Sequence, residues 1–173
     1  MNSKLKPMIY VACLAAYNAG KLHGEWIEAA QEVEALNEEV QEILKQSPEP
    51  FAEEWAIHDY EGFGDIRISE YHGLSEVSRL AFLVEEHGEA FAAYAAHVGQ
   101  DTATEETFLD AYCGHWESEL AYATDFFDEL YAHEIPEHVR YYVDYKAFSR
   151  DLFIDGCFSV RSSEHGVHVF RNS

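Results

Sequence analysis

Few residues in this sequence could do chemistry, and each of them has a simpler interpretation. Glu164, His165 and His168 resemble a metal-binding group, but residues three apart on a strand point to opposite faces. Cys113 and His115 could act as a nucleophile and a base, but the pattern supplies no third group to orient the histidine. We therefore predict no catalytic residue, no metal site and no cofactor.

Two glycine-containing segments could bind ions, and both fit solvated turns better. Residues 59–65 lack the Asp-x-Asp-x-Asp-Gly pattern and the distal glutamate of a calcium-binding EF-hand loop. Residues 20–24 contain a lysine, but they lack the sequence context of the Walker lysine and the G-x-G-x-x-G spacing of phosphate-binding loops.

The carboxylates give a stronger signal. Residues 80–139 contain 14 Asp and Glu and no Lys or Arg, which is a formal charge of −14. The whole chain has 33 acidic and 11 basic side chains, a formal charge of −22. Like charges at helical neighbour spacing cost about 0.2–0.5 kcal/mol per pair. A folded protein with so many unopposed charges is expected to use the field, and its partner should be strongly basic.

The commonest strongly basic surfaces are those that hold nucleic acid. One helical turn rises about 5.4 Å, so helical rows of carboxylates place negative charges about 5–6 Å apart. Duplex DNA has one charge per about 1.7 Å of axis, so the formal charge matches roughly 37 Å of duplex, about eleven base pairs. The residues alone allow two interpretations: a protein that imitates the charge of DNA, or an acidic face that is solvated or adapted to salt.

The composition indicates a folded protein. Hydrophobic residues make up 47% and aromatic residues 14% of the chain, whereas disordered acidic chains are poor in aromatics. No apolar run approaches the roughly 18–20 residues that span a membrane, and residues 8–16 fit a buried strand better than a secretory signal. Three widely spaced cysteines without a CxxC pattern favour reduced thiols in a cytoplasm.

Hydrophobic periodicity predicts a strand, a helix and a second strand in the first third of the chain. The strands are expected over residues 9–15 and 54–59, with residues 66–71 as a third strand or an extended connection. A helix is expected over residues 25–45, ended by the prolines at 48 and 50. On this helix a stripe of carboxylates is expected, formed by Glu25, Glu28, Glu32, Glu39 and Glu42.

The middle of the chain is expected to be helical. Ser75 is the predicted N-cap of a helix over residues 76–87 that ends at Gly88, and an alanine-rich helix follows over residues 89–98. Thr102 and Glu105 form the pattern of a capping box for a third helix, which is expected to run to residue 113.

The last third is expected to hold further helix and then a hairpin. A helix is predicted over residues 117–131 with Leu120, Phe127 and Leu130 inward, followed by helix between residues 137 and 152. Residues 157–171 alternate on both sides of a Glu-His-Gly turn and predict a β-hairpin. Strands and helices segregate rather than alternate, which indicates an α+β fold.

Four blocks of the sequence resemble the ArdA antirestriction family, in the family's order. They are IYVACLAAYNAGKLHGEWI at residues 9–27, EEWAIHDYEGFG at 53–64, RYYVDYKAFSRDLFIDG at 140–156 and VHVFR at 167–171. The likeness spans nearly the full chain. Residues 71–115 match in acidity and helical character more than in residue identity.

The resemblance implies an elongated homodimer of three small units per chain, with short antiparallel sheets at both ends and a helical middle. The units would cover residues 1–64, 65–104 and 105–173, and the last would hold the dimer interface, at residues 117–131 or 140–156. Members of this family look like bent B-form DNA and occupy the DNA-binding groove of type I restriction–modification enzymes, formed by the methyltransferase core and the specificity subunit. They are carried by mobile genetic elements, act in the cytoplasm of the bacterial host and need no cofactor.

On this basis the chain is expected to be an inhibitor and not an enzyme, with no direct binding to nucleic acid or membrane. The carboxylates expected to take the place of DNA phosphates are Glu28, Glu32, Glu39, Glu42, Glu85, Glu86, Glu89, Asp101, Glu105, Glu106, Asp110, Glu117, Glu119, Asp125, Asp128 and Glu129. Two alternatives use the same residues. One is an acidic module that antagonises another DNA-binding protein. The other is an enzyme whose acidic site has an unfamiliar pattern, which would require a few carboxylates with strongly raised pKa in one pocket.

Overall fold

The computed structural model describes residues 4–173, which form two compact units, Met1–Thr102 and Ala103–Ser173. Each unit contains a three-stranded antiparallel sheet and helices, so the predicted α+β fold is confirmed. The short sheets expected toward both ends of the chain are present, one in each unit. The finer division into three units stays a prediction.

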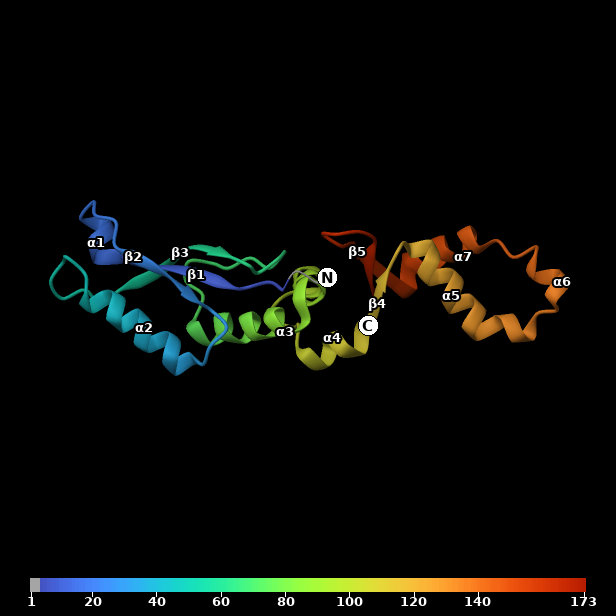
Figure 1. Cartoon of the computed structure of the whole chain (residues 1–173), viewed down its shortest axis with the longest axis horizontal. Coiled ribbons are helices and arrows are strands. Elements are labelled where there is room, and N and C mark those ends of the chain that lie inside the picture. Colours follow the sequence, from blue (N-terminus) through green and yellow to red (C-terminus); the bar gives the residue numbers. More distant parts are fainter. Residues whose placement is uncertain (1–3) are drawn as a thin grey trace. The chain divides into compact units, whose positions relative to one another are not determined.

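The first unit is built on a sheet of order β2-β1-β3 (Figure 1). Its elements in chain order are β1 (Met8–Cys13), α1 (Leu14–Asn18), β2 (Gly24–Glu28), α2 (Val33–Lys45), β3 (Trp55–Glu61) and α3 (Leu74–Val98). β1 lies in the centre, where Ile9 pairs with Ile27 of β2 and Val11 pairs with Ile57 of β3. All four of these side chains are buried, because α2 and α3 lie together on one side of the sheet (Figure 1).

Both predicted strands are present, although the first ends at Cys13, where α1 begins, and not at residue 15. The predicted end of the first long helix is confirmed, but its start is wrong. Residues 24–28 form β2 instead, and α2 begins only at Val33. GEWIE forms the edge strand of this sheet, and the backbone groups on its inner side pair with β1. Residues 66–71 form no strand but an extended connection, whose Glu70 carbonyl accepts a hydrogen bond from the Ile57 amide (3.1 Å).

α3 is sharply bent at Gly88, where the sequence predicted a break. Gly88 has φ 68° and ψ −153°, a left-handed φ that glycine adopts at little cost. The predicted N-cap is wrong: the helix begins one residue before Ser75, and Gly73 takes the cap position. Ser78 fixes the helix to the rest of the unit, since its hydroxyl donates to the Gln31 carbonyl just before α2 (2.7 Å).

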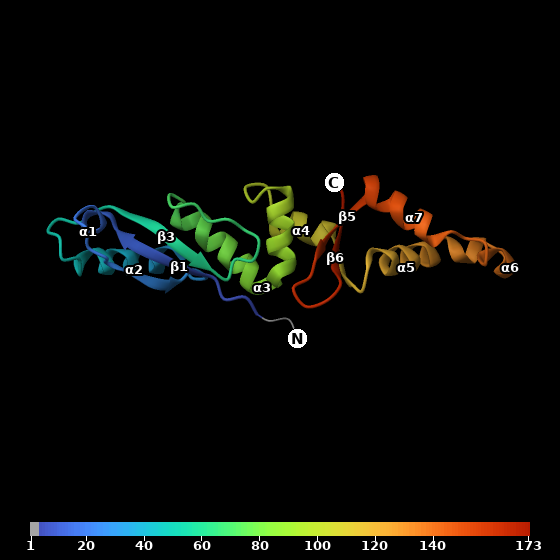
Figure 2. The same cartoon turned by 90° about the horizontal axis from the view of Figure 1, so that it is seen from above.

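The second unit is built on a sheet of order β4-β6-β5 (Figure 2). Its elements are α4 (Glu105–Ala111), β4 (Tyr112–Trp116), α5 (Glu119–Tyr131), the 3₁₀ turn Ala132–Glu134, α6 (Glu137–Arg140), α7 (Tyr145–Asp151), the π-helical turn Leu152–Gly156, β5 (Cys157–Arg161) and β6 (Val167–Arg171). β5 and β6 form the predicted hairpin, and β6 also pairs with β4. The sequence did not predict β4, which was taken as the end of a helix and the segment after it.

Aromatic packing forms the core of the second unit. Tyr122 of α5 packs with Cys157 and Val169 of the sheet. Phe127 contacts Phe148 of α7 edge-on, with ring centroids 5.1 Å apart, which holds α5 against α7. The inward face of α5 is therefore formed by Tyr122 and Ala123, followed one turn later by Phe126 and Phe127. The prediction that Leu120 and Leu130 point inward is wrong, since these side chains are 37% and 43% exposed.

The capping box of α4 is displaced by two residues from its predicted place. The Thr104 hydroxyl accepts from the Thr107 amide (3.1 Å), and the Thr107 hydroxyl accepts from the Thr104 amide (3.0 Å). Thr102 is used elsewhere, because its hydroxyl donates to the Gly99 carbonyl after α3. The predicted partner Glu105 instead lies in the first turn of α4, where a carboxylate favours the helix dipole.

Two glycines with the same backbone conformation give a matched test of packing in the first unit. A Cβ on Gly62 (φ +74°) would lie 2.0 Å from the Lys6 carbonyl oxygen, whereas a Cβ on Gly20 (φ +76°) would meet nothing within 4 Å. Both alanine variants lose about 1–2 kcal/mol through the left-handed φ. We predict that Gly62→Ala loses about 1–3 kcal/mol more, from the clash. Urea unfolding of both variants measures this, and equal losses would contradict it.

Candidate functional site

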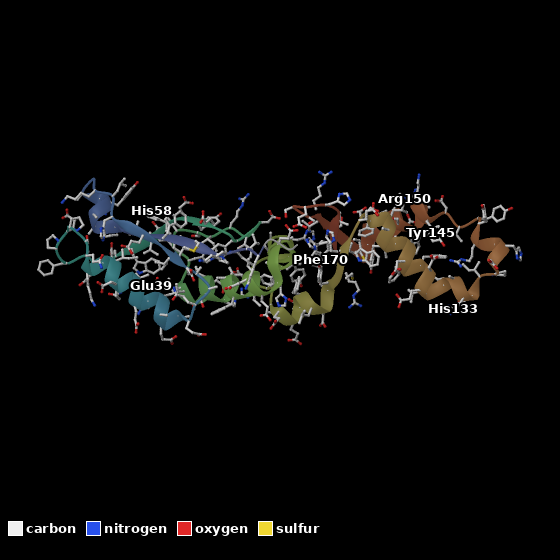
Figure 3. All side chains as sticks on the ribbon, viewed as in Figure 1. Glu39, His58, His133, Tyr145, Arg150 and Phe170 are labelled. Atoms are coloured by element: carbon white, nitrogen blue, oxygen red, sulfur yellow. The ribbon has the colours of Figure 1, made fainter. Side chains whose placement is uncertain are left out.

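The clearest acidic surface of the first unit is the outer side of α2. Glu34, Glu38 and Glu42 recur every four residues and share one face of the helix, with Glu39 beside them. All four are exposed, while the opposite face buries Leu36, Val40, Ile43 and Leu44. Side chains tipped with oxygen project outward from α2, where Glu39 is labelled (Figure 3).

The structure places the predicted carboxylates of this unit on several elements. Glu39 and Glu42 lie on α2 as expected. Glu28 and Glu32 do not continue its stripe, because Glu28 lies on β2 and Glu32 is the N-cap residue of α2. The others flank the bend of α3 and the turn after it, and they are Glu85, Glu86, Glu89 and Asp101. Each of these eight is exposed or half-buried, and none is buried.

Lysines near the start of the described chain meet two of these carboxylates. Lys6 Nζ lies 2.5 Å from Glu28 Oε1, and Lys4 Nζ lies 3.6 Å from Glu85 Oε1. The hydrogen bond to Glu28 raises the pKa of Lys6. All four side chains are substantially exposed, so these pairs contribute little to stability.

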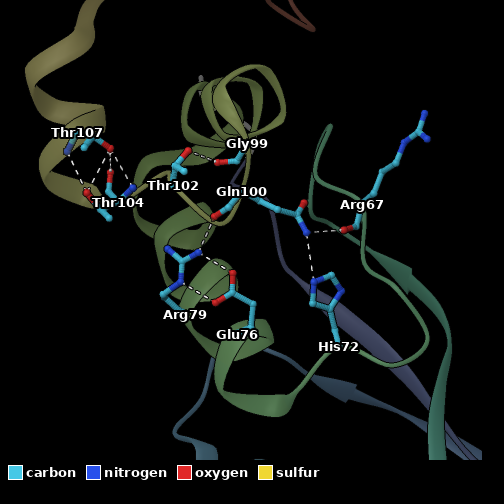
Figure 4. A network of polar contacts seen from close by, with 9 residues as sticks. All are labelled: Arg67, His72, Glu76, Arg79, Gly99, Gln100, Thr102, Thr104 and Thr107. Atoms are coloured by element: carbon cyan, nitrogen blue, oxygen red, sulfur yellow. Dashed lines mark hydrogen bonds and ion pairs between the residues drawn. The ribbon is translucent and has the colours of Figure 1, made fainter. Parts of the chain in front are cut away.

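Arg79 is the cation that organises the end of the first unit (Figure 4). Its guanidinium donates to both carboxylate oxygens of Glu76, at 2.9 and 2.7 Å, and to the Gln100 carbonyl at 2.7 Å. The Gln100 amide donates to the Arg67 carbonyl (3.1 Å). These bonds attach the turn that contains Asp101 to the first turns of α3. The half-buried Arg79 therefore positions a carboxylate that lies 22 residues further along the chain.

The second unit carries its carboxylates on α4, α5 and the loop between β4 and α5. The exposed ones are Glu105, Glu106, Asp110, Glu117, Glu119, Asp125 and Glu129. Asp128 is half-buried and structural in part, since it accepts from the Tyr145 hydroxyl (2.6 Å) and lies 3.4 Å from Arg140. The hydrogen bond with Asp128 raises the pKa of Tyr145. Asp125 and Glu129 are four residues apart and share one face of α5.

An open groove of about 960 Å³ lies in the second unit among α5, α7 and the β5–β6 hairpin. Three of the unit's five Lys and Arg residues line it, namely Lys146, Arg150 and Arg161. Carboxylates line it as well, namely Glu117, Glu119 and Glu164. The positive charge of this unit is therefore concentrated in a mixed-charge groove, which leaves the outer faces of α4 and α5 acidic.

The histidines and cysteines that could do chemistry have structural partners. His168 is buried with its Nδ1 2.9 Å from the Tyr112 hydroxyl, whereas His165 is exposed in the hairpin loop. Cys113 lies in β4, and its thiol contacts the Ala111 carbonyl at 3.4 Å. Burial raises the pKa of the Cys157 thiol, which opposes formation of a reactive thiolate. His168, Cys113 and Cys157 thus have structural surroundings that account for their positions, whereas His165 is a solvent-exposed loop residue.

Sequence reasoning missed the two carboxylates that complete the face of α2, Glu34 and Glu38. The predicted start of the helix, residue 25, lies eight residues before Val33, so the predicted stripe included acids that precede the helix. No local signal marked β2, because GEWIE does not alternate: Glu25 shares a strand face with Ile27, and Trp26 shares the other with Glu28.

The fold and its surface define an acidic α+β protein whose exposed helix faces carry carboxylates. A family model described as antirestriction protein (ArdA) matches residues 9–168 of the 173-residue chain. The chain therefore belongs to the ArdA family of antirestriction proteins, and the predicted membership is confirmed. A comparison with curated proteins gave no match. Within residues 4–173, every helix is too short or too polar to cross a bilayer.

The Arg79–Glu76 pair gives a pH-dependent prediction. Hydrogen bonding from Arg79 lowers the pKa of Glu76 below its usual value of 4.5. A carboxyl with a lowered folded-state pKa stabilises the fold above its unfolded-state pKa, and this contribution is lost as pH falls through the folded-state pKa. Glu76→Gln should therefore lose about 1 kcal/mol at pH 7, a value discounted for solvent screening.

Denaturant unfolding of the wild type and Glu76→Gln from pH 7 to pH 3 measures this difference, which should shrink below pH 4.5. Glu86→Gln, an exposed change on the same helix, serves as the control and should cause no loss. A Glu76→Gln deficit that stays constant down to pH 3 would show that the charge is not its cause.

Proposed function

We propose that this protein inhibits type I restriction–modification enzymes by occupying their DNA-binding groove in place of DNA. The observation that carries the proposal is the placement of the carboxylates. Most of them are exposed, and many lie on α2, α4 and α5, whose other faces are buried, so the fold supports rows of negative charge rather than one acidic pocket. Membership of an antirestriction family supports the choice of target.

The charge of each unit is sufficient for this role. The first unit has 19 Asp and Glu against 6 Lys and Arg, a formal charge of −13, and the second has 14 against 5, a formal charge of −9. On α2 and α5 acids recur at four-residue spacing, about 6 Å along the axis. One such row is sparser than duplex DNA, which has about one charge per 1.7 Å of axis, so several rows must act together to release counterions from a groove that binds phosphates with lysine and arginine.

The proposal includes the partner surface and the assembly. The sixteen predicted carboxylates together contact the methyltransferase core and the specificity subunit. Glu34 and Glu38 of α2, which the sequence analysis did not include, take part as well. The protein catalyses nothing, needs no cofactor and binds neither nucleic acid nor membrane. It works in the bacterial cytoplasm as a homodimer joined through the second unit, on behalf of a mobile genetic element. The division into units at 1–64, 65–104 and 105–173 belongs to the same proposal.

Because mimicry depends on many charges, a single neutralisation should have a small effect and several should add. We predict that changing Glu86, Glu106, Asp110, Glu117, Asp125 and Glu129 together to Gln or Asn weakens displacement of DNA from a purified type I enzyme by at least tenfold. All six side chains are exposed, so the fold should tolerate the change. The slope of log affinity against log salt should also become shallower.

The matched control exchanges Glu for Asp and Asp for Glu at the same six positions, which keeps every charge, and it should inhibit nearly as well as the wild type. Equal losses in both sextuple variants would mean that side-chain shape rather than charge is recognised. If the folded wild type displaces no DNA from the enzyme, the target is wrong, and capture of another basic DNA-binding protein becomes the alternative to test.

A further inference from the structure

One end of the first unit exposes large apolar side chains on two loops. Phe51, between α2 and β3, is 97% exposed, and Leu22, between α1 and β2, is 92% exposed. Figures 1 and 2 both place these loops at the same end of the unit, beside α1. The Lys21–Glu49 ion pair (2.5 Å) joins the two loops next to these residues. We call Leu22 and Phe51 the apolar tip.

The backbone at Phe51 is strained. Its φ is 60°, and among residues 4–173 it is the one non-glycine residue with a positive φ. A bulky side chain in this region is unfavourable, and glycine would relieve the strain. The exposed ring gains no burial in return. Strain of this kind persists where the surrounding structure imposes it, and it is concentrated at functional positions.

The residues just before Phe51 restrain the loop that carries it. Pro50 fixes its own φ and limits the conformation of Glu49 before it. The Glu49 amide donates to the Ser47 hydroxyl (3.2 Å), and its carboxylate is held by Lys21. The ring is thus presented to solvent by a fixed backbone, which lowers the entropy that a partner must remove on binding.

Carboxylates border the apolar tip. Glu53 and Glu54 are exposed immediately after Phe51, and Glu49 precedes it. Apolar side chains surrounded by carboxylates are complementary to an apolar hollow on a partner whose rim carries lysine or arginine. Exposed aromatic anchors of this kind account for a large share of the binding energy in protein interfaces, while surrounding charges steer association.

We propose that Phe51, assisted by Leu22, is an apolar anchor with which the first unit docks into such a hollow on a basic DNA-binding protein. The identity of that partner rests on the proposed function, and the test uses a type I restriction–modification enzyme. The carboxylate rows provide attraction that salt screens, whereas the anchor provides a contact that salt does not weaken. A purely phosphate-like surface would lack this second contribution.

The test compares Phe51→Gly with Phe51→Leu in the full-length protein. Phe51→Gly removes both the ring and the strain, so it should raise the melting temperature and yet weaken displacement of DNA about tenfold, a loss typical of an interface anchor. The loss should be the same at low and high salt, with an unchanged salt slope. Phe51→Leu keeps an apolar side chain and should retain most of the inhibition. Tyr71→Ala, which removes another exposed ring of the same unit, should change nothing.

The outcomes separate this inference from the proposed function. If the wild type displaces DNA and Phe51→Gly does so equally well at every salt concentration, the anchor is refuted and the function stands. If the folded wild type displaces no DNA, both fail. A lower melting temperature in Phe51→Gly would assign Phe51 a role in folding. A change in sedimentation without the enzyme would make the tip a contact between copies of this chain. Either result overturns the anchor.

Discussion

Repulsion among 33 carboxylates, opposed by only 11 lysines and arginines, is the constraint that the rest of this structure must satisfy. Folding brings these charges closer together, so apolar burial has to outweigh the repulsion within each small unit. The first unit does so with a central strand that buries Ile9, Val11, Ala12 and Cys13, and with α2 and α3 on one side of its sheet. The second relies on stacked and edge-on aromatic rings around Tyr122 and Phe127. The carboxylates occupy the faces that these cores leave outside.

The few cations are placed where they connect elements rather than spread over the surface. Arg79 joins the start of α3 to the turn after it, Lys21 joins two loops, and Arg140 lies near Asp128 below α7. Lys146, Arg150 and Arg161 line one groove. Ion pairs with Lys4, Lys6 and Arg140 oppose three of the predicted carboxylates, and both units still keep a large negative net charge. A surface with interspersed signs would be easier to fold but would present a much weaker field to a basic partner.

Charge density alone does not make a specific inhibitor, because any basic surface attracts an acidic one. Under the proposed function the protein must compete with DNA for the groove, and salt weakens every exposed ionic contact. A fold that adds a restrained, strained aromatic residue at one end of an acidic surface combines long-range steering with a short-range apolar contact. The two contributions depend differently on salt, which is how they can be told apart.

The sequence by itself determined the family, the α+β class, a strand near the start of the chain, the terminal hairpin and the acidity of the helices, because these follow from local periodicity, composition and recognisable blocks. That strand was predicted over residues 9–15 and lies at Met8–Cys13. The sequence did not determine β2 or β4. Each has only five residues and is stabilised by pairing with a strand distant in the sequence, so local patterns could not separate them from neighbouring helix. Tertiary structure therefore decided that Glu28 and Glu32 lie outside α2 and that Glu34 and Glu38 complete its face. It also decided the left-handed backbone of Phe51, which depends on the ion pair and hydrogen bond that hold its loop.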